Sequence, residues 1–208
     1  DDVDAYRALG QAAQREGLHE EAASAWRKVV SANPSEAKAQ AALSRALLGT
    51  GDDRAAVGAL NEALQHQPTD TELHLALGQA LVRLSRHEEA ATSFQTVTAL
   101  DESNAEAWLA LGASQVENAA WDDAVQALEA CLALDAQRVD ALALLGKARM
   151  RAGNAEAAIT SLEKAIALDG ASCQTHVQLG ELYLDAARFS EALGLFEALK
   201  RDGQEGAA

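Results

Sequence analysis

Residues 105–138 read AEAWLALGASQVENAAWDDAVQALEACLALDAQR, and stretches of the same pattern follow one another along the chain. The period is 34 residues, with no inserted or deleted residue in six copies. One position holds a small residue in each copy: Gly10, Ser44, Gly78, Gly112, Gly146 and Gly180. A second position holds alanine in each copy: Ala22, Ala56, Ala90, Ala124, Ala158 and Ala192. A fixed period of this length predicts a protein of stacked repeats.

Apolar residues within one copy are spaced as on two helices. We number positions 1 to 34 from the first residue of each copy. At 100° per residue, positions 4, 7, 8 and 11 share one face, and positions 17, 20, 24 and 27 share another. In residues 105–138 these positions hold Trp108, Leu111, Gly112 and Gln115, then Trp121, Ala124, Leu128 and Cys131. Each copy is therefore predicted to be a helical hairpin, with small residues where its two helices cross.

The turn between the two helices has its own signal. Position 15 is Gly17, Gly51 and Gly153 in three of the copies. Glycine commonly takes the left-handed conformation that ends a helix. We therefore expect the first helix of these repeats to end at position 15.

The pattern resembles the tetratricopeptide repeat, whose signature combines aromatic residues, Leu-Gly, alanine and a closing proline. The first copy supplies Tyr6, Leu9-Gly10, Ala22, Trp26 and Pro34, and the sixth supplies Leu179-Gly180, Tyr183, Ala192 and Phe196. The resemblance implies an all-α, right-handed solenoid whose first helices line a concave groove. It also implies that the groove binds peptides, helices or protein faces.

The domain organisation follows from the period. We expect one array over residues 3–206, followed by a polar, disordered tail that overlaps it at residues 201–208. The six expected helix-turn-helix units are 3–36, 37–70, 71–104, 105–138, 139–172 and 173–206.

The charge of the chain limits its partners. The 208 residues carry 32 Asp and Glu against 17 Lys and Arg, a net charge of −15. Such a charge repels nucleic acid and anionic membranes, and no apolar run reaches the roughly 18 residues that span a bilayer. We expect neither nucleic-acid binding nor direct membrane insertion. The charge serves solubility or favours a basic partner.

The outward face of the first helices is the predicted binding groove. Its apolar floor is expected from positions 5 and 12: Leu75, Leu109 and Val177, then Val82, Val116 and Met150. Position 2 supplies an acidic edge of Glu72, Glu106 and Asp140, and Arg83 adds a basic group. Exposed apolar surface of this kind marks interaction sites. The alternative for Val82 and Val116 is that position 12 packs against the next repeat.

Two known kinds of chemistry do not fit the sequence. Some tetratricopeptide proteins clamp the carboxylate tail of cytosolic chaperones with Lys and Asn side chains. Arg7 and Gln11 occupy the first two clamp places, but Ala42, Glu72 and Ala76 occupy the others, so we reject the clamp. Four of the five histidines fall at two repeat positions that hold aromatic residues in other copies, and no histidine pair has metal-site spacing. No catalytic set is indicated, and we expect no enzyme activity, cofactor or metal.

Two cysteines, Cys131 and Cys173, lie at different repeat positions and are expected to be free, buried thiols. Free thiols favour a reducing compartment, which points toward the cytoplasm.

The predicted function is a non-enzymatic scaffold that binds a protein or peptide bearing apolar and basic residues. The chain has no initiator methionine and no distinct capping helix after Lys200. Two alternatives therefore remain: a regulatory or targeting arm of a larger enzyme whose catalytic domain lies outside this chain, and self-association through an uncapped last repeat. A narrower alternative is an assembly factor of a bacterial pilus or secretion machine.

Overall fold

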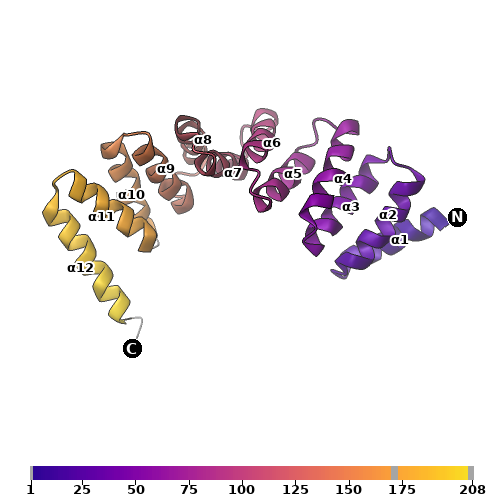
Figure 1. Ribbon diagram of the computed structural model, residues 1–208, viewed down its shortest axis with the longest axis horizontal. Helices are drawn as coiled ribbons and strands as arrows, with labels where there is room; N and C mark the ends of the chain where they lie inside the picture. The colour runs from indigo at the N-terminus through magenta and orange to yellow at the C-terminus, as the bar shows by residue number, and fades with distance from the viewer. Residues whose placement is uncertain (1, 170–172, 206–208) are drawn as a thin grey trace. The chain divides into compact units, whose positions relative to one another are not determined.

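The computed structural model describes residues 2–169 and 173–205, which form α-helices joined by short turns and contain no strand (Figure 1). The amino-terminal compact unit, Asp1–Glu102, contains α1 (Asp2–Arg15), α2 (His19–Ala32), α3 (Ala37–Thr50), α4 (Asp53–His66), α5 (Thr71–Arg83) and α6 (His87–Leu100). The carboxy-terminal compact unit, Ser103–Ala208, contains α7 (Ala105–Glu117), α8 (Trp121–Leu134), α9 (Val139–Arg151), α10 (Ala155–Asp169), α11 (Cys173–Asp185) and α12 (Phe189–Glu205).

The helices pair as the repeat predicts. Odd-numbered helices are the first helices of the repeats, and each packs against the second helix that follows it. Within each compact unit, second helices also pack against the first helix of the next repeat. The all-α repeat solenoid is therefore confirmed, and its right-handed course stays a prediction. Helix α12 runs to Glu205, residues 206–208 lie outside the described residues, and the disordered tail also stays a prediction.

The two helices of a repeat cross where position 8 meets position 24. A Cβ atom added to Gly112 would lie 2.6 Å from Cγ of Leu128, and one added to Gly10 would lie 2.8 Å from the Trp26 ring. Both distances are shorter than van der Waals contact, so the large side chain at position 24 occupies the space that a side chain at position 8 would need. The same pairing recurs as Gly78 with Phe94, Gly146 with Leu162 and Gly180 with Phe196.

The helix crossing of the second repeat has serine instead of glycine at position 8. Ser44 replaces glycine there, and its hydroxyl is fully buried and donates to the carbonyl of Ala41 at 2.8 Å. Position 24 of this repeat is Leu60, which is also fully buried. A small residue with a satisfied hydroxyl therefore suffices at this crossing.

The turn between the helices has a left-handed residue at position 15 in all six repeats. The glycines predicted there, Gly17, Gly51 and Gly153, have φ values of 71°, 80° and 83°. Ser85, Ala119 and Ala187 take the same place with φ values of 57°, 58° and 56°. At Ala119, the next amide, that of Ala120, donates to the carbonyl of Gln115 at 2.9 Å. This hydrogen bond closes the end of α7, and it holds the left-handed turn although the residue is not glycine.

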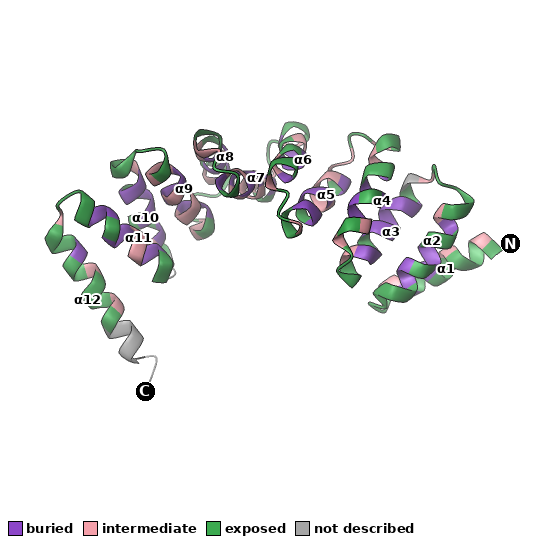
Figure 2. Cartoon of the chain, viewed as in Figure 1, coloured by how far each residue is buried: buried purple, intermediate pink, exposed green. Residues whose placement is uncertain are grey.

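Each compact unit has its own core, and buried residues line the facing sides of its helices (Figure 2). In the amino-terminal unit, Trp26 and Val29 of α2 pack with Leu43 and Leu47 of α3. In the carboxy-terminal unit, one cluster joins residues of α7, α8 and α9, and a second joins residues of α10, α11 and α12. These cores hold the first helices in register.

Gly112→Ala tests the crossing. Alanine favours a helix by about 1 kcal/mol over glycine, but overpacking against Leu128 costs about 1–3 kcal/mol. We expect the free energy of unfolding to fall by up to about 2 kcal/mol in urea denaturation. The matched control is Gly58→Ala in α4, where a new Cβ meets nothing within 4 Å; this variant should gain about 0.5–1 kcal/mol. Equal gains in both variants would contradict the close crossing.

Ala119→Gly tests the turn. A left-handed alanine costs about 1–2 kcal/mol, and glycine removes this strain at the expense of about 0.4–1 kcal/mol of unfolded-state entropy. The net expectation is a gain of about 0.5–1 kcal/mol in the same urea assay. Ala130→Gly, inside α8, is the control and should lose about 1 kcal/mol. A loss at both positions would show that Ala119 is not strained.

Candidate functional site: the outward face of the first helices

The apolar floor predicted at position 5 is half-exposed. Leu109 of α7 and Val177 of α11 in the carboxy-terminal unit are half-buried, as is Leu75 of α5 in the amino-terminal unit. Leu109 packs with one side against the cluster that contains Leu145 of α9. The first helices therefore fix these side chains in place and leave part of each accessible.

The residues at position 12 differ in burial from one repeat to another. Val116 is 1% exposed and belongs to the cluster formed with Leu145 and Ala148 of α9. Its assignment to the groove floor is wrong, because α9 of the next repeat packs over this part of α7. Met150 is half-buried against the cluster of α10, α11 and α12, whereas Val82 is 39% exposed. Helical periodicity alone cannot separate these cases, because position 12 borders both the groove and the next repeat.

The acidic edge is exposed but paired with arginines. Glu72 lies 3.3 Å from the Arg45 guanidinium. Arg138 joins two acids, with Nη2 2.6 Å from Glu106 and Nε 3.2 Å from Asp140. The hydrogen bond to Glu106 raises the pKa of Arg138 above its ordinary value. The edge therefore carries less net negative charge than the sequence indicates.

Arg138 was missed at the sequence level. It lies at position 34, in the turn between repeats, outside the helical positions used to assign the groove. Its place two residues before Asp140 is the one signal that could have found it.

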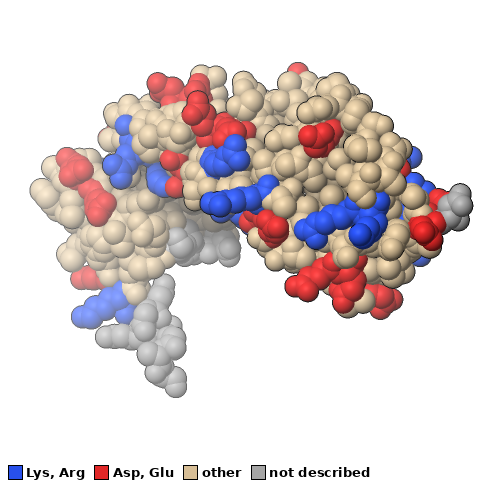
Figure 3. Space-filling view, turned by 45° about the vertical axis from the view of Figure 1, so that its right-hand side comes forward, with Lys and Arg blue, Asp and Glu red and all other residues tan. Residues whose placement is uncertain are grey.

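Arg83, predicted as a basic group of the groove, ties helices together. Its Nε forms an ion pair with Asp53 at 3.4 Å, and Nη1 donates to the carbonyl of Leu48 at 3.4 Å. Lys147 of α9 similarly lies 3.1 Å from Glu117 of α7. Figure 3 shows Lys and Arg side chains lying among Asp and Glu side chains on the face drawn. The basic groups of the first helices thus largely face acids of the same chain.

A second kind of tie links neighbouring repeats of the carboxy-terminal unit through position 11. Arg149 pairs with Glu129, and Tyr183 donates to Glu163 at 2.6 Å; both acids lie at position 25 of the preceding repeat. Burial, followed by the hydrogen bond to Glu163, raises the pKa of Tyr183 to about 12. The Arg188 guanidinium stacks over the Tyr183 ring, 4.5 Å from its centroid. These contacts hold neighbouring repeats together.

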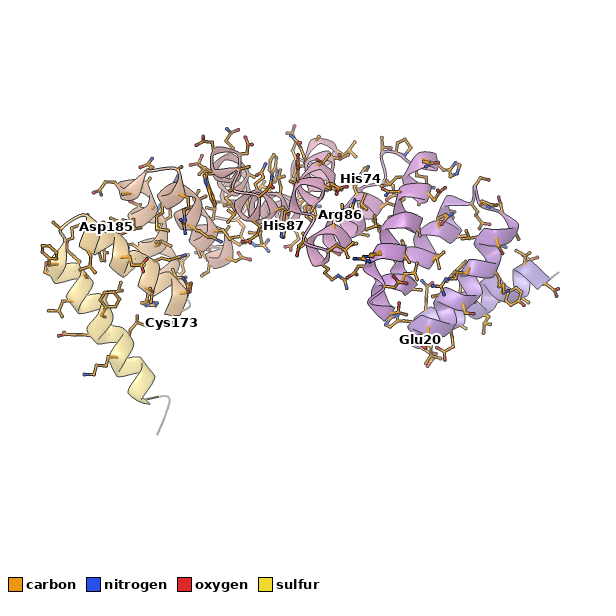
Figure 4. The ribbon with its side chains drawn as sticks, viewed as in Figure 1. Glu20, His74, Arg86, His87, Cys173 and Asp185 are labelled. Atoms are coloured by element: carbon orange, nitrogen blue, oxygen red, sulfur yellow. The ribbon has the colours of Figure 1, made fainter. Side chains whose placement is uncertain are left out.

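The surroundings of the described histidines do not indicate a metal site. His74 Nε2 lies 2.9 Å from the carbonyl oxygen of Pro68, and His74 and His87 belong to the neighbouring helices α5 and α6 (Figure 4). Nowhere in residues 2–169 and 173–205 do three His, Cys, Asp or Glu side chains gather as a metal site would need.

Both cysteines are free, as predicted. Cys131 is buried, its thiol donates to the carbonyl of Ala105 at 3.3 Å, and burial raises its pKa. Cys173 is exposed, so the expectation that both thiols are buried is wrong for this residue. Cys173 begins α11, where its side chain lies outside the packed face.

The described helices are too short or too polar for any of them to cross a lipid bilayer.

Comparisons with known proteins agree with this architecture. The family described as "Tetratricopeptide repeat" matches residues 37–80 and 139–172, and "TPR repeat" matches residues 78–118. No curated protein sequence matches the chain.

Solved structures match over most of their length. MamA from Desulfovibrio magneticus RS-1 is 26% identical with a TM-score of 0.76, over 83% of this chain and 97% of that one. YrrB, described as a TPR protein with an unusual peptide-binding site, is 22% identical with a TM-score of 0.75, over 88% and 91% of the two chains. The repeats, their packing and these matches together show that the chain belongs to the tetratricopeptide repeat family.

Proposed function

We propose that the chain is a non-enzymatic scaffold that binds a segment of a partner protein along the outward face of its first helices. The observation that carries this proposal is the half-exposed apolar side chain at position 5 of successive first helices. In the carboxy-terminal unit these residues are Leu109 and Val177, with the smaller Ala143 on α9 between them in sequence. A partner's apolar side chains would gain about 25 cal/mol for each Å² of apolar surface they cover there.

The acidic edge supplies the polar part of the proposed recognition. Glu106 and Asp140 are exposed, and both already hold a guanidinium, that of Arg138. Ion pairs in water contribute little to stability. A Lys or Arg of the partner can therefore replace Arg138 with little loss, and charge complementarity would speed the encounter. This supports a partner with apolar anchors next to basic residues.

The relatives support the same kind of function. Tetratricopeptide repeats are interaction modules, and YrrB is described as having a peptide-binding site. Val116 is excluded by its burial, and Arg83 is paired with Asp53. The proposed contact residues are Leu75, Val82 and Glu72 in the amino-terminal unit, and Leu109, Val177, the accessible part of Met150, Glu106 and Asp140 in the carboxy-terminal unit.

Peptide selection on the immobilised chain, from a displayed library of random short sequences, tests the proposal. We expect enriched peptides to contain apolar residues flanked by Lys or Arg. Leu75→Asp combined with Leu109→Asp should weaken a selected peptide at least about tenfold in fluorescence anisotropy, because each change places a carboxylate on the apolar floor.

The control variant changes an exposed leucine that lies outside the proposed binding face. Leu134 at the end of α8 is 47% exposed, and Leu134→Asp should leave the affinity unchanged. Because Leu109 also packs against the core, circular dichroism must show that the double variant is folded. Glu106→Gln combined with Asp140→Asn is a second test that leaves the core unchanged. This variant should bind basic peptides more weakly. Full affinity in the folded double variant would refute the proposed face.

A further inference from the structure

We propose that the amino-terminal unit has a separate binding site for carboxylate groups of an acidic protein segment. The site is a cavity of about 560 Å³ between α1, the start of α2 and α3. Its lining consists of Gln11, Gln14, Arg15, His19, Arg45 and Ala46. Its lining contains none of the residues proposed above to contact the partner, so it extends the proposed function without depending on the apolar floor.

The chemistry of the residues that line the cavity favours an anion as the ligand. It offers two guanidinium groups, an imidazole and two amides, and none of its described residues is acidic. This is notable in a chain with 32 acidic and 17 basic residues. Among the described side chains, no carboxylate lies within ion-pair distance of Arg15. Guanidinium and amide N–H groups together match the two oxygens of a carboxylate.

Two contacts within the unit hold the donors in place. Nε2 of Gln14 donates to the carbonyl of Ala42 at 3.0 Å, which fixes this side chain between α1 and α3. The His19 ring lies against Gly49 of α3, and a Cβ atom at Gly49 would overlap the ring. In the other repeats, the position of Gly49 holds a charged residue: Arg15, Arg83, Glu117, Arg151 and Asp185. The contact with His19 is a physical reason for glycine at this place in the second repeat.

Arg45 is available for exchange. Its present partner, Glu72, lies 3.3 Å away, and the two side chains are 59% and 79% exposed. An ion pair so exposed is weak, so a ligand carboxylate in the cavity can take the place of Glu72. Of the residues that line the cavity, Gln11 stands at a place of the chaperone-tail clamp, whereas Arg15, His19 and Arg45 do not. Ala42, Glu72 and Ala76 occupy three other clamp places.

The surroundings restrict the ligand. Glu20 follows His19 in the first turn of α2 and is exposed (Figure 4). With a net charge of −15, the whole chain repels polyanions at long range. The ligand that fits is therefore a short acidic peptide segment that presents one or two carboxylates to the cavity, rather than a nucleic acid backbone.

NMR titration of the 208-residue chain tests this site with two probes. An acetylated, amidated poly-aspartate peptide carries side-chain carboxylates only, and a Gly-Ser peptide carries only its terminal carboxylate. We expect saturable amide shifts around Arg15, His19 and Arg45 with at least one probe, and the stronger probe identifies the source of the carboxylate. A poly-asparagine peptide should cause none.

Charge-removing variants localise the binding. Arg15→Gln and Arg45→Gln should each weaken the bound probe about tenfold, the loss expected when a charge-assisted hydrogen bond is removed. Arg27→Gln on α2 removes the same charge from an exposed residue that does not line the cavity, and its affinity should stay close to that of the unchanged chain. Leu109→Asp should also leave this binding intact, so either proposal can fail alone. Absence of saturable shifts with both probes, or an equal loss in Arg27→Gln, would overturn the inference.

Discussion

The crossing of the two helices in each repeat depends on the lack of a large side chain at position 8. At Gly112 the Leu128 side chain fills the space that a Cβ atom would need, and at Gly10 the Trp26 ring does the same. This contact sets how closely the second helix lies on the first. It therefore also fixes which side of the first helix remains for a partner. The outward face of the first helices, where we propose that a partner binds, is the side that this packing does not use.

Much of this structure could be predicted from the sequence, because the repeat encodes it locally. Helical spacing correctly assigned Leu111, Ala124 and Leu128 to the interior, and all three are buried. The left-handed turn was predicted at Gly17, Gly51 and Gly153 but occurs equally at Ala119. There the hydrogen bond from the amide of Ala120 to the carbonyl of Gln115 imposes the conformation that glycine would favour.

The errors concern contacts between repeats, which a single copy does not encode. Val116 follows the same spacing as Val82, yet α9 covers Val116, while Val82 is exposed. Arg138 lies in a turn, and its pairing with Glu106, 32 residues earlier, depends on how two repeats stack. The cavity around Arg15 and Arg45 likewise combines side chains of two repeats. Periodicity predicts each hairpin, and stacking decides which polar groups meet.

The two compact units consequently offer different chemistry on the same frame. The first helices of the carboxy-terminal unit present Leu109 and Val177 with an acidic edge, which suits apolar and basic residues. The amino-terminal unit has Leu75 and Glu72 at the same repeat positions and, in addition, a cavity with Arg15 and Arg45, which suits carboxylates. Because the frame is common to both, the difference lies in a few side chains at positions 5, 9 and 13.

The most direct measurement is hydrogen exchange by mass spectrometry, with and without a peptide selected on the chain. If the first helices form the binding face, the bound peptide should slow exchange in α7, α9 and α11, or in the equivalent first helices of the amino-terminal unit. Second helices should change little. Protection confined to α8, α10 and α12, with the first helices unaffected, would contradict a binding face on the first helices.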